Sequence, residues 1–289
     1  MDTHSEGDMN AKLVDVFSAE RLSGNGLTIF PEAEGLSTAE MQALTREMRQ
    51  FESIFVWREG DAFVARIFTL EEELDFAGHP LLGLAYYLHH AFGEGDLHEW
   101  RVRLDRRTVE LTSAWRDGRF TATMAQGRPE FLKTLTNDEA GAILAALGLE
   151  FDGRRRYPAE VVSTGLPYLI LPVSGGLERV VFRVADLSPL LEAHGAKFVY
   201  VLDVEHFEGR TWDNAGRIED VATGSAAGPA AAYLHKHGLV QGSTLSIAQG
   251  RFTGRPSRIA VQLVIEGMQL ADVRVSGEVV EVADITFAD

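Results

Sequence analysis

The sequence predicts an α+β fold of two pseudosymmetric lobes, each a curled, mostly antiparallel sheet around a central helix. Two similar phrases support this, "LDFAGHPLLGLAYYL" at residues 74–88 and "EDVATGSAAGPAAAYL" at residues 219–234. In both, an Asp precedes a Gly, and a Tyr-Leu pair follows that Gly after nine and ten residues. A further observation is order, because each half of the chain reads strand, strand, helix, strand, strand, helix and then a run of strands.

The first half is predicted from apolar alternation and helix-capping residues. Ser37 and Glu40 form a capping box at the start of a helix over 38–50. The first phrase predicts a second helix, from about His79 to His90, that is apolar on nearly every side, as a helix enclosed by a sheet must be. Alternation predicts strands at 12–17, 26–30, 52–57, 62–68, 99–104, 108–113 and 119–125.

The second half repeats this order. Thr136 and Glu139 cap a helix at 137–147, and a short helix follows at 188–195. The second phrase predicts a helix over 225–238, ended by a Gly. Strands are predicted on both sides of Gly165 in "VVSTGLPYLILPV" and at 197–203, 208–213, 244–249, 258–265, 269–275 and 278–283.

Spacing supports an internal duplication. About 67 residues separate the first strand from the phrase helix in the first half, and about 64 in the second. We therefore expect a disordered leader at 1–11, an N-terminal lobe at 12–127 and a C-terminal lobe at 128–277. The last strand, at about 278–289, is expected to return to the N-terminal lobe.

Composition excludes several classes of function. The 289 residues, 45% hydrophobic and 24% charged, fit a soluble globular protein. No apolar stretch approaches the ~18 residues of a membrane helix, and the first residues lack a secretory signal, so we expect a cytoplasmic protein with no membrane partner. The net charge of −16 disfavours nucleic-acid binding. Without cysteine there is no thiolate metal site, disulfide or Cys nucleophile.

The two phrases also predict a binding site. The first turn of a helix carries unpaired N–H groups and a partial positive charge, so it attracts anions. Gly78 and Gly224 allow close approach of the backbone, and His79 and Ser225 add side-chain donors. Two such turns across a cleft would hold a small carboxylate. The alternative is that a Gly followed by small residues marks only tight helix packing.

Other motifs indicate less. "SGNGLTIF" begins like a dinucleotide fingerprint, but Ile29 occupies the place of the third Gly, so we interpret it as a tight turn. "TGSAAG" is not a nucleophile elbow because its Ser is not centred in G-x-S-x-G. The pairs His89-His90 and His235-x-His237 lie at helix ends, where imidazoles commonly face the helix dipole, and we assign no metal to them. No cofactor is expected.

Taken in order, several segments resemble the PhzF-like phenazine-biosynthesis isomerase family along essentially the whole chain. They are "VDVFSAERLSGNGLTIF", "FESIFVW", "IFTLEEELDFAGHPLLGLA", "STGLPYLILPV", "EDVATGSAAGPAAAYL" and "QGRFTGRPS". The GHP and D-x-x-T-G-S-A phrases are the most specific. The resemblance implies a diaminopimelate-epimerase-like fold with the site between the lobes, a homodimer and a small carboxylate substrate.

The resemblance also implies the roles of individual residues. It makes Glu52 the acid/base, although Phe51 replaces the usual serine before it. The catalytic set implied is Glu52, His79 and Asp220, and the substrate-binding set is Gly78, Gly224 and Ser225. The related epimerases and racemases use two cysteines at these helix starts, so the absence of cysteine excludes a two-thiol mechanism.

The expected reaction moves a proton between carbons of a bound carboxylate, with Glu52 as the single acid/base. Phe51, Ile54 and Phe55 are expected to desolvate Glu52 and raise its pKa. For the family, trans-2,3-dihydro-3-hydroxyanthranilate is the implied substrate. Two alternatives stay open: a binding or scaffold protein that has lost turnover, and a cofactor-free epimerase that pairs Glu52 with Asp220 or His79.

Overall fold

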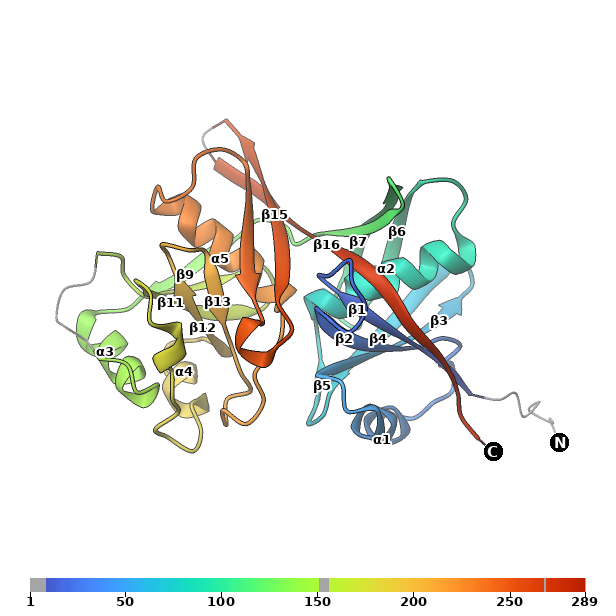
Figure 1. Cartoon of the computed structure of the whole chain (residues 1–289), viewed down its shortest axis with the longest axis horizontal. Helices are drawn as coiled ribbons and strands as arrows, with labels where there is room; N and C mark the ends of the chain where they lie inside the picture. Colours follow the sequence, from blue (N-terminus) through green and yellow to red (C-terminus); the bar gives the residue numbers. More distant parts are fainter. Residues whose placement is uncertain (1–8, 151–155, 268, 289) are drawn as a thin grey trace.

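The chain folds into two lobes that lie side by side (Figure 1). The structure is a computed structural model and describes residues 9–150, 156–267 and 269–288. Most of the leader expected at 1–11 lies outside the described residues, and the first strand already begins at Asn10. Within the described part of the chain, each helix is too short or too polar to span a membrane.

The N-terminal lobe is a closed sheet wrapped around one helix. Helix α2, Gly78–Phe92, lies inside the sheet, whereas α1, Thr38–Met48, packs outside it against β3 and β4. The sheet closes because the long last strand, β16, Gln269–Thr286, pairs with both β1, Asn10–Val16, and β8, Arg119–Ala125. The strands are β1 Asn10–Val16, β2 Asn25–Phe30, β3 Glu52–Glu59, β4 Ala62–Thr69, β5 Glu73–Leu74, β6 Leu97–Arg103, β7 Thr108–Arg116 and β8 Arg119–Ala125.

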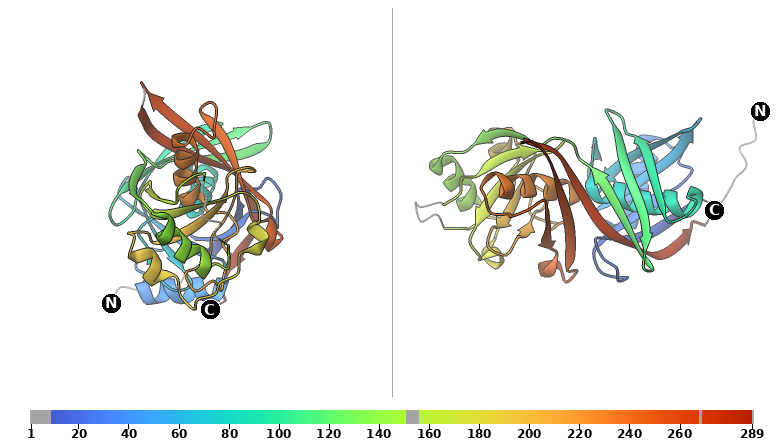
Figure 2. Two further views of the ribbon diagram at one scale, coloured as in Figure 1. Left: turned by 90° about the vertical axis from the view of Figure 1, so that its left-hand side faces the viewer. Right: turned by 90° about the horizontal axis from the view of Figure 1, so that it is seen from above.

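The C-terminal lobe also curls its sheet around one helix, α5, Gly224–Lys236 (Figure 2), but no strand pairing among the described residues closes this second sheet. Helices α3, Asn137–Ala146, and α4, Ser188–Glu192, lie outside its sheet. The strands are β9 Glu130–Thr134, β10 Glu160–Ser163, β11 Pro167–Val173, β12 Phe198–Asp203, β13 Glu208–Arg210, β14 Thr244–Gln249, β15 Ser257–Glu266 and β16 Gln269–Thr286. Short 3₁₀ turns lie at Leu177–Arg179 and Arg251–Thr253.

Strand pairing shows the duplication that the order of elements predicts. In the N-terminal lobe β2–β3 and β4–β6 are parallel, and the neighbouring pairs are antiparallel. In the C-terminal lobe the corresponding pairs β11–β12 and β13–β14 are parallel, again between antiparallel pairs. The α+β fold of two similar lobes, each sheet curled around its own helix, is therefore confirmed.

The end of the chain differs from the expectation. Two strands were expected at 269–275 and 278–283, but β16 is one continuous strand that pairs with β15, β8 and β1 in turn. Gly277 is the reason for the error, because it reads as a break in the sequence. In the structure it makes room for an aromatic ring, since a Cβ added there would lie 2.4 Å from Phe17 Cδ1.

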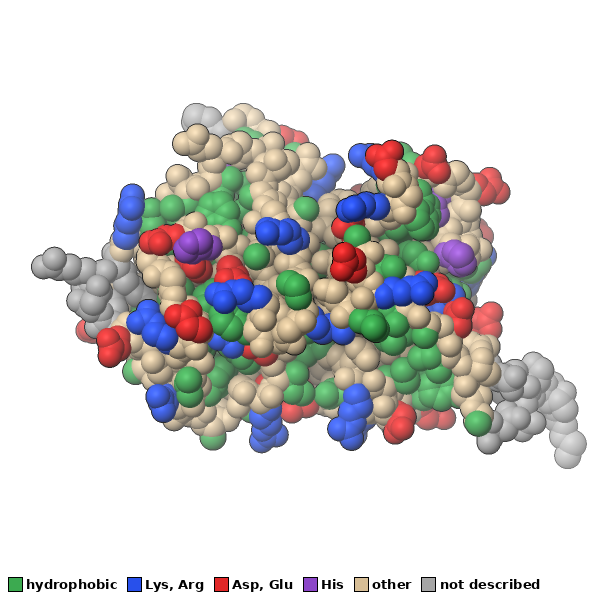
Figure 3. Space-filling view, viewed as in Figure 1, with side chains coloured by type: hydrophobic (Ala, Val, Ile, Leu, Met, Phe, Trp, Pro, Cys, Tyr) green, Lys and Arg blue, Asp and Glu red, His purple; other side chains and the backbone are tan. Residues whose placement is uncertain are grey.

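Two short strands escape the sequence analysis. Strand β9 is almost wholly exposed and so lacks the alternation of buried and exposed residues that would mark it. Strand β5 is a two-residue segment paired with β4. Both central helices belong to one hydrophobic core that continues from one lobe into the other. On the face shown in Figure 3, acidic and basic side chains are interspersed rather than gathered into a basic patch.

Candidate active site

The four longer helices fall into two classes by how they begin. Helices α1 and α3 each start with a complete capping box, Ser37 with Glu40 and Thr136 with Glu139. Helices α2 and α5 start without any side-chain cap. Capping satisfies first-turn N–H groups, so the two central helices keep theirs available for another acceptor.

The two uncapped helix starts touch each other. A Cβ added to Gly78 would lie 2.6 Å from the backbone nitrogen of Ser225 and 2.7 Å from the carbonyl carbon of Gly224. No residue larger than glycine fits at position 78 unless the backbone moves. The two positive ends of the helix dipoles are thus brought together at the junction of the lobes.

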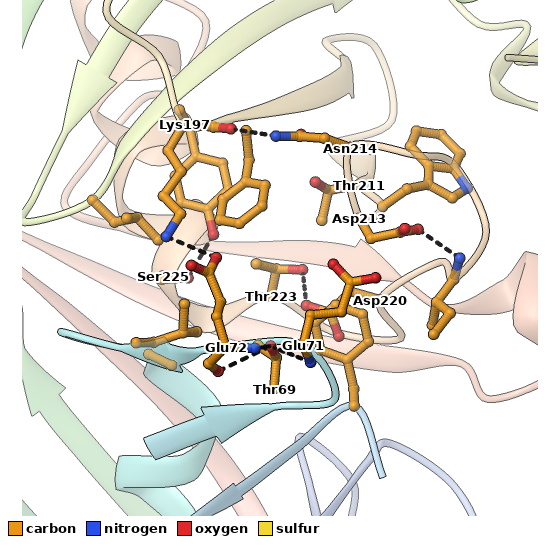
Figure 4. A pocket seen from close by; sticks show the side chains of 18 of the residues that line it. Thr69, Glu71, Glu72, Lys197, Thr211, Asp213, Asn214, Asp220, Thr223 and Ser225 are labelled. Atoms are coloured by element: carbon orange, nitrogen blue, oxygen red, sulfur yellow. Dashed lines mark hydrogen bonds and ion pairs between the residues drawn. The ribbon is translucent and has the colours of Figure 1, made fainter. Parts of the chain in front are cut away.

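A cavity of about 840 Å³ opens at this junction (Figure 4). Its inner wall includes both helix starts and the side chains of Glu52, His79 and Asp220. Aromatic and aliphatic side chains also line it, namely Phe51, Leu74, Phe76, Leu166, Phe198 and Trp212. All six residues that the family resemblance implies, from both lobes, therefore line one cavity. Glu72 and Lys197 form an ion pair of 3.1 Å across its mouth.

Glu52 and His79 form a buried hydrogen-bonded pair. Glu52 is the first residue of β3 and His79 is the second residue of α2, and their side chains meet with 3.0 Å between Oε2 and Nδ1. The two residues are only 6% and 2% exposed. The other ring nitrogen of His79, Nε2, is buried and has no hydrogen-bond partner among the described residues. It is therefore free for a molecule bound in the cavity.

Burial raises the pKa of Glu52 above its ordinary value. The neighbouring imidazole of His79 opposes this by stabilising the carboxylate, and the negative charge of Asp220 adds to it. Of the three apolar neighbours expected to desolvate Glu52, Phe51 lines the cavity and Ile54 belongs to the core around α2. The expectation for Phe55 is wrong, because successive residues of a strand face opposite sides and Phe55 packs under α1 instead.

Asp220 is held by two donors. Asn25 Nδ2 lies 2.7 Å from Asp220 Oδ1, and Thr223 Oγ1 donates to the other carboxylate oxygen. Asn25 Nδ2 also donates to the carbonyl of Ala222 at 2.9 Å, which uses its second hydrogen. The approach of Asn25 to His79 Nδ1, at 3.3 Å, is therefore not a further hydrogen bond, and Glu52 remains the partner of that nitrogen.

Buried side chains that the sequence analysis did not identify hold the start of α5. Gln249 Nε2 donates to the Asp220 carbonyl at 2.8 Å and to Thr223 Oγ1 at 2.9 Å. Gln126 Nε2 donates to the Gly224 carbonyl at 2.8 Å. Tyr168 OH lies 2.8 Å from Ser225 Oγ. Asn25 was visible as the residue between two glycines of "SGNGL", but the sequence carries no comparable signal for the two glutamines.

The histidine pairs at the helix ends have other partners. His89 lies between Ser113 Oγ, at 2.6 Å, and the Gly95 carbonyl, at 3.0 Å. His237 contacts Glu160, whose second carboxylate oxygen also binds Lys236. Across the described residues, no group of three or more side chains has an arrangement suited to a metal ion.

A family model for phenazine biosynthesis-like proteins (PhzC-PhzF) matches residues 14–284. The chain belongs to the PhzF family. It is 37% identical over 281 residues to a trans-2,3-dihydro-3-hydroxyanthranilate isomerase of Pseudomonas aeruginosa. The match covers 92% of this chain and 94% of that protein. It is 34% identical to an uncharacterised isomerase of Mesorhizobium japonicum, and the match covers 95% of this chain and 97% of that protein.

Solved structures extend the comparison. A protein of Pseudomonas aeruginosa described as a predicted epimerase superposes with a TM-score of 0.91 at 48% identity, over 97% of this PhzF-family chain and 99% of that one. A probable proline racemase of Agrobacterium radiobacter shares the fold, with a TM-score of 0.60 at 14% identity over 97% and 93% of the two chains. This PhzF-family protein is therefore an isomerase with an epimerase-like fold.

Proposed function

We propose that this isomerase moves a proton between two carbons of a small carboxylate substrate, with Glu52 as the acid/base. The observation that carries the proposal is the buried Glu52–His79 pair beside two uncapped helix starts in one cavity. The helix starts supply N–H donors for the substrate carboxylate. Burial raises the pKa of Glu52 toward the range in which a carboxyl group can both accept and return a proton.

The reaction runs through one carboxylate. Glu52 accepts a proton from a carbon made acidic by conjugation to the bound carboxylate, and the resulting charge spreads toward the helix starts. While Glu52 holds it, this proton can exchange with solvent, and Glu52 then delivers a hydrogen to another carbon on the same face of the substrate. His79 Nδ1 holds the Glu52 carboxyl group in place, and His79 Nε2 is available to the substrate.

The geometry disfavours the epimerase alternative. Inversion at one carbon needs two bases on opposite faces of the substrate. His79 is hydrogen-bonded to Glu52 and therefore lies on the same side as Glu52. Both carboxylate oxygens of Asp220 already accept hydrogen bonds, from Asn25 and Thr223, so each is engaged within the protein.

The relatives indicate a first substrate to test. The similar Pseudomonas proteins are named trans-2,3-dihydro-3-hydroxyanthranilate isomerases, at 37% and 34% identity. This compound carries the carboxylate that the helix starts are suited to bind, and the apolar side chains that line the cavity can pack against its ring. We propose it as a substrate of this protein.

Proton NMR in D₂O tests the proposal. The wild type should convert trans-2,3-dihydro-3-hydroxyanthranilate with uptake of deuterium at carbon, and Glu52→Gln should lower the rate by at least about 10²-fold. Glu160→Gln is the matched control, since Glu160 is equally buried but contacts Lys236 and His237 instead of the cavity. Binding without deuterium uptake would favour the scaffold alternative, and deuterium uptake with inversion at one carbon would favour the epimerase.

A further inference from the structure

Tyr168 and Ser225 form an isolated pair of buried hydroxyl groups in the cavity wall. Tyr168 lies in β11 and Ser225 is the second residue of α5, and their oxygens are 2.8 Å apart. They are only 3% and 5% exposed. Among the described residues, neither hydroxyl group has a second hydrogen-bond partner.

The chemistry of the two hydroxyl groups indicates its direction. Each hydroxyl carries one hydrogen, and either oxygen could be the donor. Both residues line the cavity, so a hydrogen left over on either of them can turn toward a bound molecule. A phenol is intrinsically a stronger hydrogen-bond donor than an aliphatic hydroxyl group, so we assign the hydrogen of this bond to Tyr168, and the hydrogen of Ser225 then turns toward the cavity. Burial also raises the pKa of Tyr168, so the phenol keeps its proton at neutral pH.

The first turn of α5 then presents backbone and side-chain donors to the cavity. The first-turn N–H groups of this helix have no side-chain cap. The hydroxyl hydrogen of Ser225 is directed toward the cavity beside them. A carboxylate, which only accepts, matches such a surface. A primary amide matches it less well, because only its single carbonyl oxygen can accept from these donors, whereas both oxygens of a carboxylate can.

We propose that Tyr168 is a positioning residue that makes Ser225 a hydrogen-bond donor and so gives the α5 start its preference for a carboxylate over a neutral amide. The proposal rests on the proposed function only in placing the substrate carboxylate at the helix starts. It does not depend on proton transfer by Glu52. Tyr168 acts through Ser225 and takes no part in the chemical step.

Calorimetric titration with anthranilate and with its neutral analogue anthranilamide tests the preference. Tyr168→Phe should weaken anthranilate binding about tenfold, the equivalent of one charge-assisted hydrogen bond, and change anthranilamide binding less than about twofold. Tyr233→Phe is the matched control, because it removes a buried phenol that binds the Pro158 carbonyl away from the cavity and should leave both affinities unchanged. Equal loss for both probes, or no loss for anthranilate, would overturn the proposal.

Thermal unfolding of the double variant tests the mechanism separately. Ser225→Ala leaves the Tyr168 phenol without an acceptor, so adding Tyr168→Phe to Ser225→Ala should raise the midpoint of unfolding. The same change in the wild type should lower it. Additive effects of the two substitutions would show that Tyr168 does not act through Ser225.

Turnover separates this proposal from the proposed function. In an active enzyme, Tyr168→Phe should raise KM and leave the pH dependence of kcat unchanged. Anthranilate binding without any proton exchange would leave Tyr168 in its role while removing Glu52 from its own. A wild type that binds neither probe would overturn both the carboxylate site and the role of Tyr168.

Discussion

Gly78 touches the backbone of Ser225, so the starts of the two central helices are in direct contact although they belong to different lobes. A Cβ on Gly78 would lie 2.6 Å from Ser225 N, closer than side-chain carbons come to backbone atoms. The conformation of Gly78 itself is ordinary, with no positive φ. Contact between the lobes, and not backbone strain, requires glycine here.

Gly78→Ala should therefore separate the helix starts. We expect a loss of about 1–3 kcal/mol in the free energy of unfolding, as for other overpacked sites. Anthranilate affinity should fall more than about tenfold, since the donors no longer converge. Urea unfolding and calorimetric titration measure the two effects. Gly95→Ala is the control, because its added Cβ meets no other atom within 4 Å and only its φ of +77° opposes the change. Unchanged ligand binding in Gly78→Ala would contradict the prediction.

The pKa of Glu52 predicts how stability depends on pH. Burial raises this pKa in the folded state, so between the ordinary and the raised value the folded protein holds a proton that the unfolded chain has lost. The contribution of Glu52 to stability is thus present at low pH and lost as the pH rises through the raised pKa. Glu52→Gln removes the titration, so its advantage in unfolding temperature over the wild type should grow with pH.

Glu160 is a control for Glu52, because its pKa shifts in the opposite direction. Burial alone would raise its pKa, but hydrogen bonds from Lys236, His237 and Thr134 lower it below the ordinary value. Its contribution is present above the ordinary pKa and lost as the pH falls through the lowered one. Glu160→Gln should therefore be less stable than the wild type at neutral pH, and the difference should shrink on acidification. Parallel pH profiles for the two variants would contradict the assignment for Glu52.

The sequence was sufficient to predict those parts of the fold that local signals specify. The capping boxes that begin α1 and α3 were predicted residue by residue, and both are present. The repeated phrases located both central helices, whose starts differ from the prediction by a single residue. Gly277 misled because a glycine in sequence does not show whether it turns the chain or accommodates a neighbouring ring, here that of Phe17.

The interior of the site was harder to predict because its contacts join distant parts of the chain. Asn25 reaches Asp220 across 195 positions, and Gln126 reaches Gly224 across 98. No periodicity or spacing in one sequence records such pairs. Phe55 shows a related limit. It lies close to Glu52 in the sequence, which suggested contact, but side chains alternate between the two faces of a strand, and Phe55 lies on the face opposite Glu52.

Asn25 should be essential because it donates a hydrogen bond to the buried carboxylate of Asp220. Asn25→Asp would replace a donor 2.7 Å from Asp220 by a second carboxylate in a buried site. Two carboxylates at this distance cannot both stay ionised, so they should share a proton. The variant should be less stable than the wild type at pH 7 and recover part of the loss near pH 5. Asn25→Ala, which removes the donor without adding charge, should lose about 1–3 kcal/mol with little dependence on pH in this range. Equal behaviour of the two variants in thermal unfolding would argue against a shared proton.

Glu72 and Lys197 join the lobes across the mouth of the cavity, with 3.1 Å between the charged atoms (Figure 4). Glu72 follows β4 in the N-terminal lobe, and Lys197 directly precedes β12 in the C-terminal lobe. Both side chains are partly exposed, so the pair should contribute less than about 1 kcal/mol to the free energy of unfolding. Its position gives it a larger effect on the separation of the lobes than on folding.

Glu72→Gln should therefore keep the unfolding temperature of the wild type and open the cavity in the free protein. Small-angle scattering should show a larger radius of gyration for this variant, and anthranilate should compact it more than it compacts the wild type. About 1 M salt should have the same effect on the wild type and little on the variant, because it screens the pair. Glu59→Gln is the control, since Glu59 pairs with Arg103 within one lobe and should not change the profile. Scattering profiles that are identical with and without anthranilate, in both the wild type and Glu72→Gln, would show that the lobes do not move and that the ion pair does not control their separation.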